Sequence, residues 1–375
     1  MKQVYLLTII ILIILSQIFD IALTFREDYS KRYGTNLDEA YKNPDSILKL
    51  DISRRKLKVF PIKVTKFKNL EYLDAMFNMI PQLPSEIGKF IKLKVFNFKF
   101  NELASLPSEI GKLVRLEELD LAVNHLTGLP PEIGNLIRLK RLILNSNKLE
   151  KLPPNIGRLT ELELLYIRYN KLEELPPEIG EMKNLKFLKL AKNKLKYIPK
   201  EIGKLSNLVN LELWSNQLKD VPKEITKLSN LVVLSLDKNQ LKTLPKGIGK
   251  LGELSSLTLI SNKLKEVPES LAKCSNLKVL YLSNNQLKSI PKGIGKLRKL
   301  TNLDFSNNQI KSLPIEITKL SNLEELHLSS NQLNELPTEI NKLINLKEFD
   351  LKNNPLSAKE KEKIKKLLPN CKIIF

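Results

Sequence analysis

A 23-residue period is the feature that most constrains what this chain can fold into. From Ile47 onward, apolar residues recur at the first, fourth, sixth and eleventh positions of each period, and the last period begins at Leu346 with no insertion or deletion before it. These fourteen repeats cover most of the 375 residues. A chain of this length would ordinarily form two or three domains, but stacked repeats share one continuous core. We therefore expect a single elongated array.

The apolar spacing within one repeat predicts its local structure. Positions 4 and 6 alternate with polar residues, which is typical of a short strand with one buried face. Positions 11, 14, 18 and 21 are apolar at spacings of three and four, which favours a helical or coiled return segment on the same core. Neither segment can bury its apolar face alone. We expect the copies to stack and their strands to form one parallel sheet.

Three further positions carry fixed residue types that we interpret as scaffold. Position 9 is Asn in thirteen repeats and Arg55 in the first, and an amide there can donate to and accept from backbone groups of neighbouring turns. Position 15 is Pro from Pro61 to Pro337, which ends the strand and begins the return segment. Position 19 is Gly in eight repeats, which permits a tight backbone. None of the three positions indicates a ligand.

The pattern Leu-x-x-Leu-x-Leu-x-x-Asn-x-Leu, followed by Leu-Pro-x-x-Ile-Gly-x-Leu, resembles the leucine-rich repeat family. Examples begin at Leu139 and Leu175. The resemblance implies an α/β leucine-rich-repeat solenoid, or horseshoe, with a concave parallel sheet, short helical or irregular convex segments, and partner binding on the concave face. The Leu-Pro/Ile-Gly subtype looks like secreted or surface repeat proteins of bacteria. It is also similar to intracellular plant and animal repeat proteins that scaffold signalling.

Both ends of the chain depart from the period. Residues 1–24 contain an apolar run, Val4 to Leu15, of signal-peptide length, which predicts a cleaved signal peptide or an uncleaved N-terminal anchor. Residues 25–46 are polar and predict an N-terminal cap with a short helix over 37–42. The array occupies 47–356, and residues 357–375 predict a C-terminal cap made of an amphipathic helix begun by Ser357 and a last strand.

Charge and cysteine content narrow the class of protein. The net charge is +21, from 62 Lys and Arg against 41 Asp and Glu, which makes acidic partners plausible. Cys274 takes a core position, and Cys371 lies too many repeats away to reach it, so we expect neither a disulfide nor a cysteine-based metal site.

The candidate partner-binding site lies where the concave positions 3, 5, 7 and 8 become least polar. Aromatic, aliphatic and cationic side chains gather there on four adjacent repeats, a composition typical of interface hot spots. An earlier group of Tyr72, Met76, Phe77, Val95, Lys99 and Phe100 extends it toward the N-terminus. The alternative is that these side chains pack only against one another across the strands. The site residues are Ile143, Leu164, Tyr166, Arg168, Tyr169, Phe187, Lys189 and Trp214.

Aligned lysines mark the return segments of the later repeats. They suggest either a docking stripe for an anionic surface or polysaccharide, or a solvated face in which Glu201 and Glu224 offset Lys204 and Lys227. Nucleic acid is disfavoured because no aromatic residues are interleaved to stack on bases. The stripe consists of Lys196, Lys200, Lys204, Lys219, Lys223, Lys227, Lys242, Lys246, Lys250, Lys288, Lys292 and Lys296.

Catalytic chemistry finds little support in the sequence. His327 shares position 5 with Asp304 and Asp350 of the flanking repeats, which suggests a metal-binding row or, more simply, a polar surface. No nucleophile motif or phosphate loop is present. We expect a monomeric, non-enzymatic protein without cofactors that is exported (secreted, periplasmic or at the cell surface) and binds a host or cell-surface protein. The alternative is a signalling scaffold that is intracellular or held at a membrane by its N-terminal segment.

Overall fold

The computed structural model describes residues 37–375, which form one parallel sheet with a short helix behind nearly every strand. Each strand pairs with the next strand in the sequence, so sheet order and chain order are the same. The predicted fold class is confirmed. The strands are β1 (Lys49–Asp51), β2 (Tyr72–Asp74), β3 (Val95–Asn97), β4 (Glu118–Asp120), β5 (Arg141–Ile143), β6 (Leu164–Tyr166), β7 (Phe187–Lys189), β8 (Asn210–Glu212), β9 (Val233–Ser235), β10 (Ser256–Thr258), β11 (Val279–Tyr281), β12 (Asn302–Asp304), β13 (Glu325–His327), β14 (Glu348–Asp350) and β15 (Lys372–Ile374).

The return segments contain short 3-10 helices, which the apolar spacing had predicted only as helical or coiled. Most have five residues at positions 16 to 20 of the repeat. They are η2 (Ile62–Lys66), η3 (Ser85–Lys89), η4 (Ser108–Lys112), η5 (Pro131–Asn135), η6 (Pro154–Arg158), η7 (Pro177–Glu181), η8 (Lys200–Lys204), η9 (Lys223–Lys227), η10 (Ile248–Lys250), η11 (Glu269–Lys273), η12 (Lys292–Lys296), η13 (Ile315–Lys319) and η14 (Thr338–Lys342).

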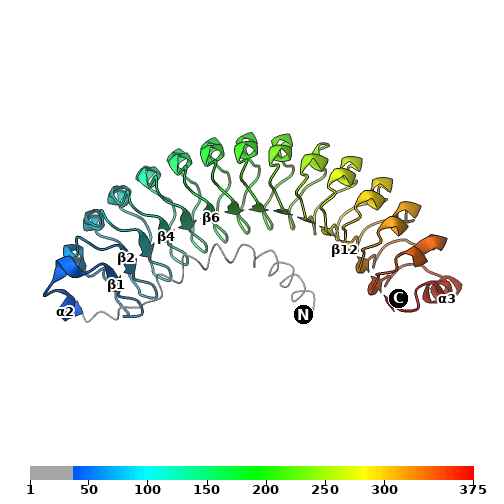
Figure 1. Ribbon diagram of the computed structural model, residues 1–375, viewed down its shortest axis with the longest axis horizontal. Coiled ribbons are helices and arrows are strands. Elements are labelled where there is room, and N and C mark those ends of the chain that lie inside the picture. The colour runs from blue at the N-terminus through cyan, green and yellow to red at the C-terminus, as the bar shows by residue number, and fades with distance from the viewer. Residues whose placement is uncertain (1–36) are drawn as a thin grey trace.

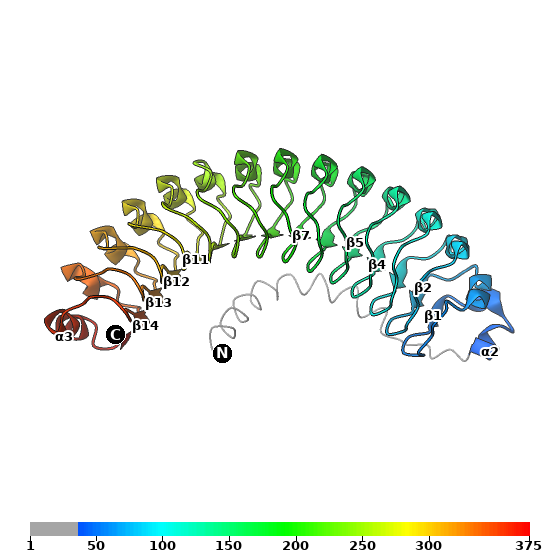
Figure 2. The same ribbon diagram turned by 180° about the vertical axis from the view of Figure 1, so that it is seen from behind.

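The stacked repeats bend into an arc. Figure 1 shows the strands along the inner, concave edge and the 3-10 helices along the outer, convex edge, and Figure 2 shows the same arrangement from behind. Positions 3, 4 and 5 of each repeat form the strand, and pairing joins equal positions of neighbouring repeats, as in Leu188 with Leu211. Side chains at position 4 point into the core, so positions 3 and 5 face the concave side.

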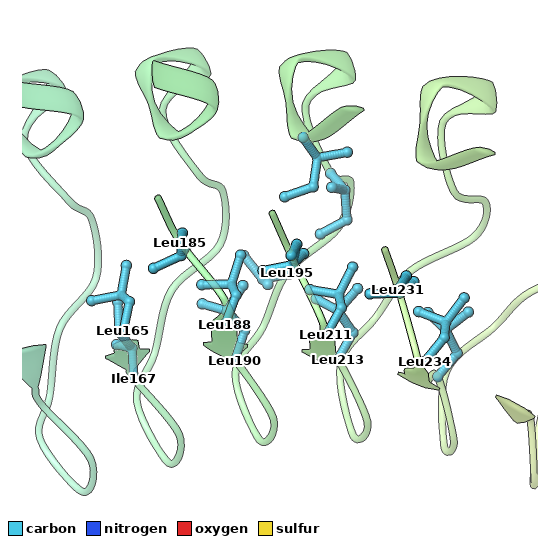
Figure 3. Packing of buried hydrophobic residues seen from close by; sticks show 14 of the residues in the cluster. Leu165, Ile167, Leu185, Leu188, Leu190, Leu195, Leu211, Leu213, Leu231 and Leu234 are labelled. Atoms are coloured by element: carbon cyan, nitrogen blue, oxygen red, sulfur yellow. The ribbon is translucent and has the colours of Figure 1, made fainter. Parts of the chain in front are cut away.

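The core runs without a break between the sheet and the helices. Leu185, Leu188 and Leu190 of one repeat are fully buried and pack against their equivalents Leu211 and Leu213 in the next (Figure 3). Because each repeat covers its neighbour's apolar face, the stack rather than the single repeat is the folding unit.

The asparagines of position 9 form a buried ladder, as predicted. Asn193 accepts a hydrogen bond at Oδ1 from the Leu172 amide (3.0 Å), and its Nδ2 donates to the carbonyls of Ile167 (2.8 Å) and Leu190 (3.0 Å). One side chain therefore satisfies backbone groups of two successive repeats. In the first repeat Arg55 replaces the Asn, and its amide donates to Asn78 Oδ1 (3.1 Å).

A second asparagine ladder, at position 23, escaped the sequence analysis. Asn184 Nδ2 donates to the Thr160 carbonyl (3.0 Å) and Asn207 Nδ2 to the Lys183 carbonyl (3.0 Å), and both asparagines are exposed. These bonds join each repeat to the one before it on the turn that precedes the strand. The position is Asn in only part of the array, which is why the period did not reveal it.

Proline and glycine fix the helical turns. The Pro84 carbonyl accepts from the Ile87 amide (3.1 Å), so position 15 begins the 3-10 turn. At position 19 a Cβ built on Gly180 would lie 2.4 Å from the Glu201 carbonyl oxygen of the next repeat. No glycine among the described residues has a positive φ. At Gly180 the glycine permits a close approach of consecutive helices and is not needed for an unusual backbone angle, and other repeats carry Thr226 or Ala272 at this position.

The two ends of the described chain close the stack. At the N-terminal end lie α2 (Leu37–Ala40) and η1 (Pro44–Ser46). At the C-terminal end, Ser357 caps α3 (Ala358–Leu367) by accepting a hydrogen bond at Oγ from the Glu360 amide (3.1 Å), and β15 completes the sheet. Cys274 is buried, and both cysteines are free.

The predicted signal peptide or anchor, residues 1–24, and the beginning of the predicted N-terminal cap lie outside the described residues. Within 37–375, none of the helices combines the length and apolar character needed to cross a bilayer.

Candidate functional site

The residues predicted for the binding site fall on the concave side of β5 to β8 and on the turns that follow these strands. Strand pairing aligns Ile143, Tyr166, Lys189 and Glu212 in one row at position 5. A second row at position 3 holds Arg141, Leu164, Phe187 and Asn210. The structure therefore places the predicted residues on one continuous surface.

Glu212 joins the charged residues of this surface. Its carboxylate forms ion pairs with the Arg168 guanidinium and with Lys189 Nζ, the latter at 3.5 Å. Lys189 Nζ also lies 4.4 Å from the centre of the Tyr166 ring, a cation–π geometry. The side chains of Lys189 and Glu212 are mostly buried, so solvent screens the pair only weakly. This network holds Tyr166, Lys189 and Arg168 in place.

A second group of contacts lies on the turns after β6, β7 and β8. The rings of Tyr169 and Trp214 meet edge to face with centroids 6.3 Å apart. Lys192 Nζ lies 4.8 Å from the centre of the Tyr169 ring and 5.6 Å from that of Trp214. Tyr169 is 47% exposed, the highest value among the predicted site residues. We call Tyr166, Arg168, Tyr169, Lys189, Lys192, Glu212 and Trp214 the central cluster.

The backbone of position 8 is left-handed throughout the array. Its φ lies between 52° and 58° in all fourteen repeats, and Tyr169 (57°) and Lys192 (54°) of the central cluster are among them. Residues with a Cβ adopt this conformation at a cost of roughly 1–2 kcal/mol each. The surrounding ladder of backbone hydrogen bonds imposes the turn, and the turn projects these two side chains beside the concave face.

Leu164 departs from the prediction. It was expected to be exposed on the binding face, but it is only 9% exposed between Arg141 and Phe187 of the adjacent strands. The reason is that long side chains at position 3 of neighbouring strands cover a residue between them. Leu164 therefore packs against its neighbours on the sheet, which is the alternative to partner binding given in the sequence analysis. The residues of the central cluster also contact one another. These contacts leave the ring of Tyr169 largely open to solvent.

Three buried polar atoms at this surface have no hydrogen-bond partner in the described chain: Arg141 Nε, Arg168 Nε and Asn210 Oδ1. Arg141 Nε lies 3.6 Å from Glu118 Oε2, too far for a hydrogen bond. Most buried polar atoms are paired, so these three atoms, on β5, on the turn after β6 and on β8, are exceptions within this part of the array.

The N-terminal extension of the site contains a stacked aromatic pair. Phe77 and Phe100 lie 4.3 Å apart at 7° between ring planes, and both are exposed. Arg54 covers the outer face of Phe77, 4.6 Å from its centre. Val95 is buried, whereas Tyr72, Met76 and Lys99 are half-buried. This group is separated from the central cluster by β4 and β5.

The predicted histidine row is present. Asp304, His327 and Asp350 are paired in register on β12, β13 and β14. His327 Nε2 lies 3.7 Å from Glu325 Oε2, and this carboxylate, with Asp304 nearby, raises the pKa of the imidazole. Among the described residues, no three His, Cys, Asp or Glu side chains are placed to hold a metal ion together. The row is a polar, partly charged surface.

The lysine stripe lies along the outer side of the array, where all twelve lysines are exposed. Glu201 and Glu224 were expected to offset Lys204 and Lys227, and the charge of Glu201 does act on Lys204, but neither glutamate forms an ion pair with its lysine within 4 Å. Lys204 pairs with Glu181 of the preceding repeat (2.7 Å), and no carboxylate of the described chain lies within 4 Å of Lys227.

Two members of the central cluster were missed in the sequence. Glu212 continues the row of Tyr166 and Lys189 by one repeat, and Lys192 follows Tyr169 in the position-8 column. Following each column by one more repeat would have found both. The acidic Glu212 does not fit the predicted pattern of aromatic, aliphatic and cationic side chains, whereas the cationic Lys192 does.

The array, its asparagine ladder and its concave sheet define a repeat solenoid of the leucine-rich type. Family models agree: one described as "Leucine-rich repeat region" matches residues 178–283 and 265–369, and one described as "Leucine rich repeat" matches 114–172 and 137–195. The chain belongs to the leucine-rich repeat family.

Solved structures place the chain among bacterial and plant relatives. It is 40% identical to a leucine-rich repeat protein of Leptospira interrogans, over 91% of this chain and 98% of that one, with a TM-score of 0.65. An internalin of Listeria monocytogenes is 25% identical over 89% and 88% of the two chains, with a TM-score of 0.69. A plant peptide hormone receptor, solved with its peptide, is 32% identical over 83% of this chain and 52% of that one, with a TM-score of 0.76. A search of curated proteins found no match.

Proposed function

We propose that this protein is a non-enzymatic binding module that recognises another protein through the concave face of β5 to β8. The observation that carries the proposal is the central cluster. It combines an open Tyr169 ring with Trp214, two lysines and Arg168 on a surface preorganised by ion pairs and ring contacts. Tyr, Trp and Arg are the residues most enriched at the energetic centres of protein interfaces.

The unpaired polar atoms support the same surface. Asn210 Oδ1 and Arg168 Nε are buried and unpaired, so a partner that reorients these two side chains on binding would supply the missing hydrogen bonds. The plant receptor that resembles this chain binds a peptide hormone, as its description states. That precedent supports a protein or peptide as the partner here.

We also propose that the protein is exported. The support is the apolar run from Val4 to Leu15, which has the length of a signal-peptide core and is shorter than a bilayer requires. Mass spectrometry of the protein from its native cells tests this proposal. Loss of about the first 24 residues is expected, whereas an intact Met1 would indicate the anchored alternative.

A double variant tests the binding face. Tyr166→Ala with Trp214→Ala removes two anchors, each worth roughly 2 kcal/mol at an interface, so affinity should fall by about a thousandfold. The partner used in this test is the protein that the wild-type chain captures from extracts of candidate cell surfaces. The affinity of each variant for this partner is measured by titration.

The matched control is Ile260→Ala with Tyr281→Ala. These residues occupy the same positions 7 and 5 on later repeats, and both are half-buried. The control should keep wild-type affinity, and circular dichroism should show the same fold in all three proteins. Equal affinity of the Tyr166/Trp214 variant and the wild type would refute the assignment of the face.

A further inference from the structure

The later repeats carry positive charge that the described chain does not balance with neighbouring carboxylates. Residues 213–323 contain 18 Lys and Arg against 8 Asp and Glu. In this described segment no Lys or Arg lies within 4 Å of a carboxylate, whereas ion pairs occur on both sides of it. The excess of positive charge is therefore concentrated in residues 213–323, and it lies on exposed side chains.

The lysines of this segment stand in columns. Position 12 is Lys in six consecutive repeats and position 20 in seven, and all of these side chains are exposed. Position 16 adds Lys200, Lys223, Lys246 and Lys292. We call these the basic columns. They comprise Lys196, Lys219, Lys242, Lys265, Lys288 and Lys311 at position 12, and Lys204, Lys227, Lys250, Lys273, Lys296, Lys319 and Lys342 at position 20.

Equal positions of adjacent repeats are within ion-pair reach. At the start of the columns, Lys196 pairs with Glu173 at position 12 and Lys204 with Glu181 at position 20, each at 2.7 Å. In the repeats that follow, each lysine of a column has another lysine at the same position of the preceding repeat. Like charges at this spacing repel, and the repulsion is relieved only by salt or by a bound anion.

Repeat duplication alone does not account for the columns. Position 12 is Glu150 and then Glu173 before it becomes Lys196, and position 20 is Glu181 before Lys204. The scaffold accepts acidic residues at both positions, so the frame of the repeat does not require lysine there.

We propose that the basic columns bind a flexible, linear acidic polysaccharide that follows the convex arc. The inference is independent of the concave-face proposal, since it concerns the opposite side of the solenoid. The position-12 column spans five steps between repeats, at least roughly 24 Å at the spacing of paired strands. A flexible chain with regularly spaced carboxylate or sulfate groups can follow such a column over its whole length.

The shape of the surface disfavours other anions. A flat bilayer touches a convex arc at only a few repeats (Figure 1). Duplex DNA is too stiff to follow the bend. Single-stranded nucleic acid requires aromatic residues for stacking, and within residues 196–342 Tyr197 is the one exposed aromatic side chain, with its hydroxyl bonded to Glu174.

A triple variant tests the proposal on the full chain. Lys242, Lys246 and Lys250 belong to one repeat, and no acidic residue lies between them in the sequence. Their replacement by Gln should weaken binding to heparin fragments of defined length by roughly tenfold at low salt. All three are exposed, so the fold by circular dichroism should not change.

The control carries the same charge change elsewhere: Lys148→Gln, Lys171→Gln and Lys194→Gln, three exposed lysines at position 10. It should keep near-wild-type affinity, and wild-type binding should fall as salt is added. Absence of wild-type binding, or equal weakening in both triple variants, would overturn the proposal. Tighter binding to DNA or to anionic lipid vesicles that is lost in the same triple variant would overturn it in favour of that ligand.

Discussion

Asn193 illustrates how one side chain joins successive repeats. Its amide satisfies the Leu172 N–H and the carbonyls of Ile167 and Leu190, all away from solvent. Asn193→Ala leaves these groups unpaired, and each unpaired buried group costs about 1–3 kcal/mol. We expect the free energy of unfolding, measured in urea, to fall by about 3 kcal/mol.

Asn184→Ala is the control for this prediction. Asn184 also makes an amide-to-carbonyl bond to the preceding repeat, but it is exposed, and water can replace it. Its loss should cost about 1 kcal/mol or less. Equal losses at the two positions would contradict a buried ladder as the source of stability.

His327 gives the array a pH dependence with a defined sign. The Glu325 carboxylate and the Asp304 and Glu348 charges raise its pKa above that of an exposed imidazole. A raised pKa means that the folded state binds the proton more tightly than the unfolded state. The resulting stability is fully present below the unfolded pKa of about 6.5 and is lost as the pH rises through the folded pKa.

His327→Gln should therefore destabilise the protein by about 1 kcal/mol near pH 5.5 and have little effect near pH 8.5. Urea unfolding at the two pH values measures the difference. His125 is the sole other histidine in the sequence, so an NMR titration can assign the raised pKa directly. A larger destabilisation at the alkaline pH would show that the sign is wrong.

For single residues, the sequence predicted the structural roles of residue types that recur at a fixed position of the repeat. The asparagine ladder could be foreseen because one residue type returns at one position. The left-handed turn at position 8 could not, because Phe77, Val123 and Tyr169 are not residues that favour a positive φ. The burial of Leu164 depends on the side chains of two other strands, which no single repeat contains.

At the scale of the element, consecutive 3-10 helices set how closely the repeats stack on the convex side. Gly180 lies close to the Glu201 carbonyl, and an added methyl group would lie 2.4 Å from that oxygen. Gly180→Ala should force η7 and η8 apart and lower the unfolding free energy by about 1–3 kcal/mol.

Gly128→Ala is the matched control, because a Cβ there has no atom within 4 Å. Reduced freedom of the unfolded chain should make it neutral or stabilising by about 0.5 kcal/mol. The free energies of unfolding of the two variants are measured in urea and compared with that of the wild type. A Gly180→Ala protein as stable as Gly128→Ala would mean that the helices separate without cost.

The spacing of apolar residues predicted a return segment but not its helix type. Spacings of three and four fit an α-helix, a 3-10 helix or an irregular turn equally well. Pro at position 15 and the next apolar anchors leave five residues for the turn in most repeats. The short 3-10 form follows from this lack of length, which becomes clear only when the stack is built.

At the scale of the whole molecule, the two sides of the solenoid differ in how their charge is arranged. On the concave side, Glu212 balances Arg168 and Lys189 within the central cluster. On the convex side, the basic columns beyond Lys204 have no carboxylate partner within 4 Å in the described chain. A concave site for a protein and a convex site for a polyanion therefore draw on different physical features, and each can be removed without the other.

The fold of the whole molecule was predictable because every repeat has the same pattern of apolar, Asn and Pro positions and therefore predicts the same local structure. The sequence also predicted which residues gather on the concave side, where the free positions become aromatic, and their role in binding a partner stays a prediction. The internal contacts of the candidate site were not predictable, because they join different repeats: Glu212 meets Arg168 and Lys189 of the two preceding repeats, and Trp214 meets Lys192 of the preceding one. The partner's identity depends on these variable positions and not on the frame.

The most direct test of the central claim uses Trp214, the single tryptophan of the chain. Acrylamide quenching of its fluorescence is measured for the full chain alone and with the captured partner, in the wild type and in the Lys242/Lys246/Lys250→Gln variant. Binding on the concave face predicts that the partner shields Trp214 and reduces quenching to the same degree in both proteins. Unchanged quenching in a saturated complex would contradict the claim that this face binds the partner.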